Sequence, residues 1–151
     1  MHVLWSFINK RDAVVSAVKA YRNMEAIIEN TPDEVREQEL SMVSPRASRL
    51  SGMPSSPNPK GGEQRIVSLI NNIDTSRERY RQALEYMEWF VPAWNTLTDK
   101  ESTILSEFYM SENLRSGATK RLSELLSYSH SHIERLKNKA ITQLAHLLFG
   151  L

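Results

Sequence analysis

A repeating apolar pattern between Ile66 and Val91 constrains the fold of this chain more than any other feature. Its members recur at alternating spacings of four and three residues, with one charged position among them. The full series is Ile66, Ile70, Ile73, Arg77, Tyr80, Leu84, Met87 and Val91. Such a seam is typical of a helix that packs along a partner helix, in a coiled coil or in an ordinary helical core. The pattern therefore predicts a long helix, and it leaves both kinds of packing open.

A second helix is expected near the N-terminus, where apolar residues recur at spacings of three, four and seven. Asp12 is suited to cap its start, and Pro32 is expected to end it. The stripe consists of Val14, Val18, Tyr21 and Ile28. This helix could pack on the longer one within the chain, or either helix could pair with a second subunit. We therefore predict an N-terminal pair of long helices, with a coiled coil as one form that it could take.

Serine, proline and glycine make up 13 of the 22 residues from 41 to 62, which predicts a flexible or extended linker. The sequence thus divides into an N-terminal helix over 1–40, this linker over 41–62, a heptad-like helix over 63–91 and a C-terminal domain over 92–151. Pro92 marks the start of the last segment, because proline interrupts helices. No segment shows the strict alternation of a β-strand, so the predicted fold class is all-α.

The composition excludes several classes of protein. The chain has no cysteine, which rules out disulfides, thiolate metal sites and a cysteine nucleophile. No run approaches the roughly 18 apolar residues of a membrane helix, and the N-terminus lacks the pattern of a secretion signal. We therefore expect a cytoplasmic protein without a membrane partner. The formal net charge is only +1, so any binding to nucleic acid must come from local clustering of basic residues.

The histidines at positions 130 and 132 do not form a convincing metal site or catalytic pair. Residues two apart on a helix point about 200° away from each other, whereas helical zinc motifs space their ligands by four. No glycine-rich phosphate loop or nucleophile motif is present either. We expect no metal, no cofactor and no catalytic residues, so the chain is not expected to be an enzyme.

The C-terminal segment has the pattern of a helix-turn-helix. A capping box, Thr98 with Glu101, starts a first helix. A short helix over about 118–126 follows, and a longer one begins after Ser129, which we expect to be its N-cap. From Arg115 to Lys139 there are six basic residues and two acidic ones. A basic cluster on this layout favours DNA binding over a solvated helix face.

The stretches "LTDKESTILSEFY" and "LSELLSYSHSHIERLKNKAITQL" resemble the helix-turn-helix of sigma-factor region 4. In that pattern, Ser129, Ile133 and Ala140 occupy the N-cap and two apolar positions. The segments "SPRASRLSGMP" and "KAITQLAHLLFG" further resemble phage late-gene transcription regulators of the ArpU and RinA type. The chain departs from the sigma pattern at Ser127, where glycine is usual. The resemblance implies a transcription regulator, and activation of phage late genes in a bacterial host cell.

The same layout assigns roles to individual residues. His130, Ser131 and Arg135 are expected to face base edges, since they lie near the start of the second helix. Lys120, Arg121, Lys137 and Lys139 are expected to contact phosphates, which adds affinity without sequence choice. Histidine side chains gain charge as the pH falls from about 8 to about 6, so DNA affinity should rise over that range.

The expected partners are double-stranded DNA, host RNA polymerase and a second copy of the chain, paired through 12–30 and 63–91.

The sequence leaves two other functions open. The chain could instead be a helical adaptor bound to RNA polymerase, or a packaging protein that resembles a small terminase subunit. A ring of many subunits would favour the packaging protein, whereas a monomer or dimer would favour the regulator.

Overall fold

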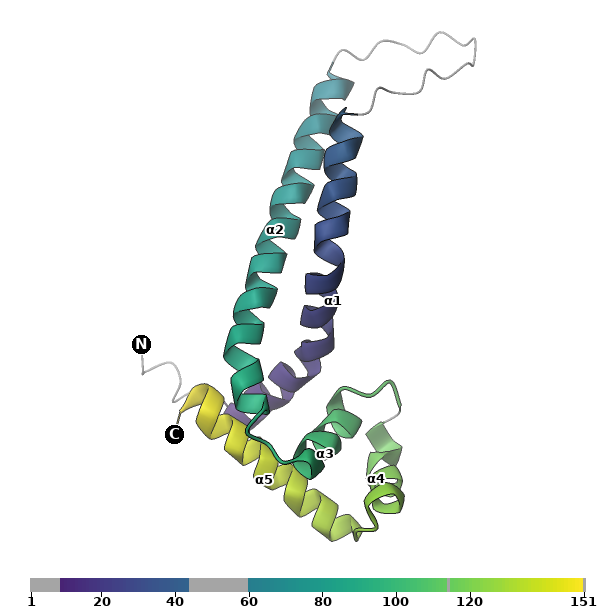
Figure 1. The fold of residues 1–151 in the computed structure, drawn as a ribbon, viewed down its shortest axis with the longest axis vertical. Coiled ribbons are helices and arrows are strands. Elements are labelled where there is room, and N and C mark those ends of the chain that lie inside the picture. Colours follow the sequence, from purple (N-terminus) through teal and green to yellow (C-terminus); the bar gives the residue numbers. More distant parts are fainter. Residues whose placement is uncertain (1–8, 44–59, 114, 151) are drawn as a thin grey trace. The chain divides into compact units, whose positions relative to one another are not determined.

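The computed structural model describes residues 9–43, 60–113 and 115–150, and the part it describes contains helices and turns but no strand. Its elements in chain order are α1 (Lys10–Val43), α2 (Gly61–Trp94), α3 (Asp99–Tyr109), the short 3₁₀ helix η2 (Arg115–Gly117), α4 (Ala118–Leu126) and α5 (His130–Phe149) (Figure 1). The predicted all-α class is confirmed. No helix in these ranges combines the length and apolar character that a membrane span needs.

Two expected helix ends are wrong, because both α1 and α2 continue through a proline. Pro32 lies inside α1 and Pro92 lies inside α2. A proline in a helix removes one backbone hydrogen bond and costs about 3 kcal/mol. Thr31, which precedes Pro32, is buried, and so are Phe90 and Ala93 on the two sides of Pro92. The predicted linker over 41–62 also changes, since α1 includes its first three residues and α2 its last two; residues 44–59 lie outside the described part.

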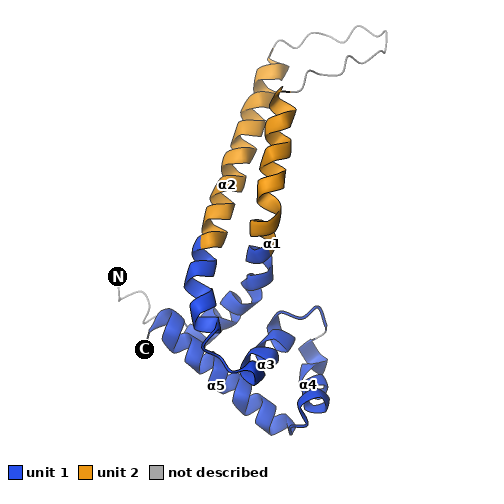
Figure 2. Ribbon diagram, in the orientation of Figure 1, with its two compact units in different colours: residues 1–25, 85–151 blue, residues 26–84 orange. Residues whose placement is uncertain are grey.

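The chain divides into two compact units, residues 26–84 and residues 1–25 with 85–151 (Figure 2). In the unit 26–84, α1 and α2 lie side by side. The charged member of the apolar seam, Arg77, donates from Nη2 to Oε1 of Glu39 at 2.9 Å, and Arg65 donates to the carbonyl of Ser41 at 3.1 Å. Ile73 is buried, but other apolar residues on this pair of helices stay 39–82% exposed: Leu40, Val43, Ile66, Val67, Ile70 and Leu84. Two helices alone therefore cover only part of the seam.

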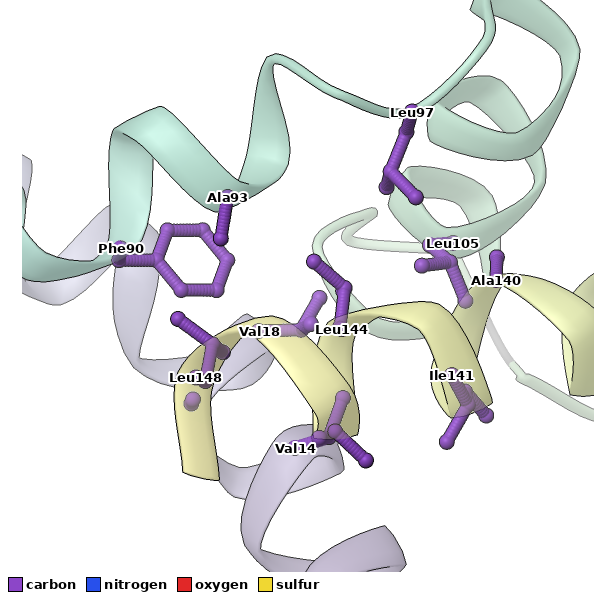
Figure 3. Packing of buried hydrophobic residues seen from close by; sticks show 12 residues of the cluster. Val14, Val18, Phe90, Ala93, Leu97, Leu105, Ala140, Ile141, Leu144 and Leu148 are labelled. Carbon is purple, nitrogen blue, oxygen red and sulfur yellow. The ribbon is translucent and has the colours of Figure 1, made fainter. Parts of the chain in front are cut away.

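The other unit has a core to which four helices and the α2–α3 connection contribute. Val14 and Val18 of α1 pack with Phe90 of α2, Leu105 of α3 and a face of α5 (Figure 3). Phe90 has no exposed surface, and its ring lies 5.2–6.5 Å from four other aromatic rings, those of Tyr21, Tyr86, Trp89 and Trp94. The half of the α1 stripe around Val14 and Val18 is thus occupied within the chain and is not available for pairing with a second subunit.

Hydrogen bonds to backbone carbonyls hold the aromatic side chains in this core. The Tyr86 hydroxyl donates to the carbonyl of Ala17 at 2.6 Å, and the Trp89 indole donates to that of Leu148 at 3.3 Å. Burial, and then the neighbouring Tyr21, raise the pKa of the Tyr86 hydroxyl, which therefore stays protonated as a donor. Buried aromatic residues with polar groups usually find such partners.

A second apolar cluster joins the three C-terminal helices. Ile104 and Phe108 of α3, Ala118 and Leu122 of α4, and Ile133 of α5 are all buried in it. Each side chain lies on the apolar stripe of its own short helix, so the three helices bury these stripes against one another. This cluster sets how α4 and the first turns of α5 are presented.

Candidate nucleic-acid interface

The predicted capping box at the start of α3 is present, and it has a further role. The Thr98 side chain accepts from the backbone N–H of Glu101, while Oε2 of Glu101 accepts from the backbone N–H of Thr98 at 3.1 Å. The other carboxylate oxygen of Glu101 lies 3.2 Å from Nζ of Lys139. Glu101 is buried, whereas Lys139 is exposed. One carboxylate therefore caps α3 and also links it to α5.

The ionised form of Glu101 is favoured despite its burial. Burial alone raises the pKa of this carboxyl group. Hydrogen bonds from the Thr98 backbone and hydroxyl, together with Lys139, lower the pKa by more, so it ends below the ordinary value of 4.5. A lowered pKa means that the charged carboxylate stabilises the folded state above the unfolded pKa. This stabilisation is lost as the pH falls through the lower, folded pKa.

Glu101→Gln is expected to lower the free energy of unfolding at pH 7 by about 1–3 kcal/mol, because a buried acceptor loses its charge and its ion pair. The difference between the native chain and the variant should shrink as the pH falls below about 4.5. Urea unfolding at pH 7 and at pH 3 measures both effects. The exposed Glu112, which pairs with Arg22 at 3.6 Å, provides a control in Glu112→Gln, which should change little. Equal losses in the two variants would contradict the role of Glu101.

A three-residue turn, Ser127 to Ser129, connects α4 to α5. Ser127 adopts a left-handed backbone conformation, with φ 56° and ψ 37°. Glycine reaches this region at no steric cost, whereas serine carries a side chain that disfavours it. The Ser123 hydroxyl of α4 donates to the carbonyl of Tyr128 at 2.6 Å, and Lys100 of α3 contacts the Tyr128 hydroxyl. The turn is therefore held from α3 as well as from α4.

Ser129 is the N-cap of α5, and its hydroxyl accepts from the backbone N–H of His132 at 3.2 Å. From there, α5 presents two different faces. The buried face consists of Ile133, Lys137, Ala140, Ile141, Leu144, Ala145 and Leu148. The opposite face is exposed and polar, and it consists of Ser131, Arg135, Lys139, Thr142 and His146. This exposed set, which recurs at helical spacing, is called the polar stripe below.

The residues expected to read bases lie together at the start of α5. His130 is exposed, and Ser131 and Arg135 form the first part of the polar stripe. His132 is less exposed and packs edge-on against Tyr128, with ring centroids 4.6 Å apart. The first two turns of α5 thus offer one arginine, one hydroxyl and one imidazole to a partner.

The four residues expected to contact phosphates do not form one surface. Lys120 at the start of α4 is exposed. Arg121 is partly buried and pairs with Glu107 of α3 at 2.5 Å. Lys139 is exposed but lies against Glu101. Arg121 and Lys139 therefore already serve contacts between helices.

Lys137 differs most from its expected place, because it is buried. Its Nζ lies 2.5 Å from Oε2 of Glu134 and 4.5 Å from the centre of the Phe108 ring. It occurs four residues after Ile133 and three before Ala140, which are both buried, so helical spacing puts it on the same face. A contact between Lys137 and a phosphate would require breaking these interactions, and we assign Lys137 to positioning α5.

Glu134 is the single carboxylate of α5, and it is engaged within the protein. Besides Lys137, it accepts from the Thr119 hydroxyl of α4 at 3.5 Å. The polar stripe itself carries no carboxylate, and two of its members, Arg135 and Lys139, are cationic. A cation-bearing face of this kind suits an anionic partner, because negative charge on α5 would otherwise repel phosphate.

Three residues that no sequence pattern singled out, Lys10, Arg11 and Asn138, connect the first turn of α1 to α5. Asn138 of α5 accepts a hydrogen bond from Arg11, which stands 127 residues earlier in the first turn of α1. Lys10 of the same turn donates to the carbonyl of Gly150 at 2.7 Å. No local pattern could have indicated these contacts, since they depend on how α1 packs across α5.

No group of three or more histidine, aspartate or glutamate side chains within 9–43, 60–113 and 115–150 is arranged to hold a metal ion. Comparison with protein-family models, with curated proteins and with solved structures gave no match for this chain.

Proposed function

We propose that this chain is a sequence-specific DNA-binding transcription regulator, in which α4 and α5 act as a helix-turn-helix. The observation that carries the proposal is the polar stripe of α5, which is exposed, cationic and free of carboxylates. It starts at a capped helix end that follows a three-residue turn, as in helices that enter the major groove. The chain would act by binding rather than by catalysis.

In this proposal, the first turns of α5 read base edges. Arg135 would donate two hydrogen bonds to a guanine, the strongest of the common side-chain contacts to a base. His130 and Ser131 would contact neighbouring bases or be placed close to them. Lys120 would neutralise a phosphate, whereas Arg121 and Lys137 would support the helices from within. Lys139 has two roles, since it pairs with Glu101 and also faces the partner.

The resemblance to sigma-factor region 4 and to phage late-gene regulators extends the proposal to activation of phage late genes in a bacterial host. An activator also needs a contact with RNA polymerase or with a second subunit. The exposed apolar residues of the unit 26–84, among them Ile66, Ile70 and Leu40, are candidates for that contact. A packaging protein of the small-terminase kind is a second candidate function. Such proteins assemble through helices, and the same exposed apolar residues could form contacts between subunits.

Selection from a pool of random DNA duplexes tests the proposed function. We expect the chain to enrich one short sequence motif and to bind it about 10³-fold more tightly than a scrambled duplex. A pool that shows no enrichment would contradict sequence-specific binding. Light scattering on the same sample separates the two candidates: a monomer or dimer supports the regulator, and a ring of many subunits supports the packaging protein.

A further inference from the structure

We infer that the first turn of α1 belongs to the DNA-binding surface, where Arg11 and Asn138 together bind a backbone phosphate. The inference rests on the proposed function and adds a binding site to it. A hydrogen bond in which Arg11 Nη2 donates to Oδ1 of Asn138 holds the two side chains together. Arg11 is exposed, and Asn138 is partly exposed at the border of the polar stripe.

The chemistry of this pair specifies an anionic ligand. The Asn138 oxygen accepts from Arg11, so the groups that the pair has left to offer are chiefly N–H donors: those of the guanidinium and the two of the amide. A positive charge combined with several donors fits phosphate oxygens, which arginine binds with short charge-assisted hydrogen bonds. Asp12, the carboxylate next to Arg11 in sequence, accepts from the Asn9 amide at 2.7 Å at the start of α1.

Helix geometry relates this pair to the start of α4. Glu134 and Asn138 are four residues apart, so they lie on the same side of α5, about 6 Å apart along its axis. Each receives a hydrogen bond from another helix: Glu134 from Thr119 of α4, and Asn138 from Arg11 of α1. Lys120 directly follows Thr119. The starts of α4 and α1 therefore flank the same side of α5.

This side borders the polar stripe. Asn138 occurs three residues after Arg135, which makes the two residues neighbours on the helix surface. A duplex whose bases meet Arg135 would bring one strand of its backbone along the side where Arg11 lies. The N-terminal turn of α1 is held there by Val14 in the core and by the bond from Lys10 to Gly150. The structure thus assigns to α1 a fixed place in the interface.

The salt dependence of DNA binding tests the inference. Each neutralised phosphate adds about 0.9 to the slope of log affinity against log salt. We expect Arg11→Ala to reduce this slope by about 0.9 and to weaken binding about fivefold at 0.15 M salt, for the selected duplex and a scrambled duplex alike. Asn138→Asp should reduce the slope similarly, because a carboxylate beside Arg11 cancels its charge. Arg36→Ala, which removes an exposed arginine from the unit 26–84, is the matched control and should leave the slope unchanged.

The outcomes separate the inference from the proposed function. If Arg11→Ala and Asn138→Asp leave the slope at the native value while the native chain still prefers its selected duplex, the inference is wrong and the proposed function stands. If the native chain shows no preference among duplexes, the proposed function is wrong, and the inference that rests on it is wrong as well. Thermal unfolding of each variant shows whether it folds, and Arg11→Lys, which keeps the charge, should retain most of the slope.

Discussion

Arg135→Ala is expected to weaken binding to the selected duplex by roughly 5- to 150-fold, which corresponds to the 1–3 kcal/mol of a bidentate contact between arginine and guanine. Preference at one base pair of the site should relax at the same time, because only that guanine loses its partner. Fluorescence anisotropy with duplexes substituted at each position measures both effects. Arg135 is exposed and lies opposite the buried face of α5, so the fold should be unaffected.

Arg36→Ala provides the comparison for this prediction, since it removes the same charge from an exposed position in the other unit. We expect it to retain native affinity and native base preference. If Arg135→Ala behaves like Arg36→Ala, the start of α5 does not read DNA. Lys139→Ala is a poorer test than Arg135→Ala, because it also removes the cation that pairs with the buried Glu101.

Phe90→Ala is expected to lower the free energy of unfolding by about 3–5 kcal/mol, the usual cost of removing a large buried aromatic side chain. The effect should be near the upper end, since Phe90 has no exposed surface and its ring contacts those of Tyr21, Tyr86, Trp89 and Trp94. Denaturant unfolding followed by tryptophan fluorescence measures it. Leu125→Ala, at a position that is 69% exposed, is the control and should cost less than about 0.5 kcal/mol.

A small loss in Phe90→Ala would contradict the role of this core in holding α1 against α5. This core also affects the proposed function, because Val14 of α1 and Leu148 of α5 belong to the same cluster as Phe90. A variant that loosens the cluster should therefore also weaken DNA binding through the Arg11 side. Binding and stability measured on the same samples connect the two effects.

Local rules were enough to predict much of the C-terminal segment. The capping box at Thr98 and Glu101 involves residues three apart, and the start of α5 follows from Ser129, whose hydroxyl caps its own helix. These features depend on a few neighbouring residues, so the sequence contains the information that determines them.

The orientation of α5 could not be predicted in the same way. Lys137, which was expected to contact phosphate, is buried, whereas Leu147 of the same helix is 51% exposed. Long-range packing accounts for this, because Val14 and Val18 of α1 and Phe90 of α2 belong to the same buried cluster as Ile141, Leu144 and Leu148. Pro92 shows the same effect, since Phe90 and Ala93 on its two sides are buried in this cluster and the helix continues through the local stop signal.

Amide chemical shifts measured by NMR during titration with the selected duplex locate the DNA-binding surface most directly. We predict the largest changes at Ser131, Arg135 and Asn138 of α5, with further changes at Arg11 and Lys120. We predict little change at Asp33 and Glu37, which lie in the unit 26–84. Changes confined to that unit, with none along the exposed face of α5, would contradict the proposal that α5 reads DNA.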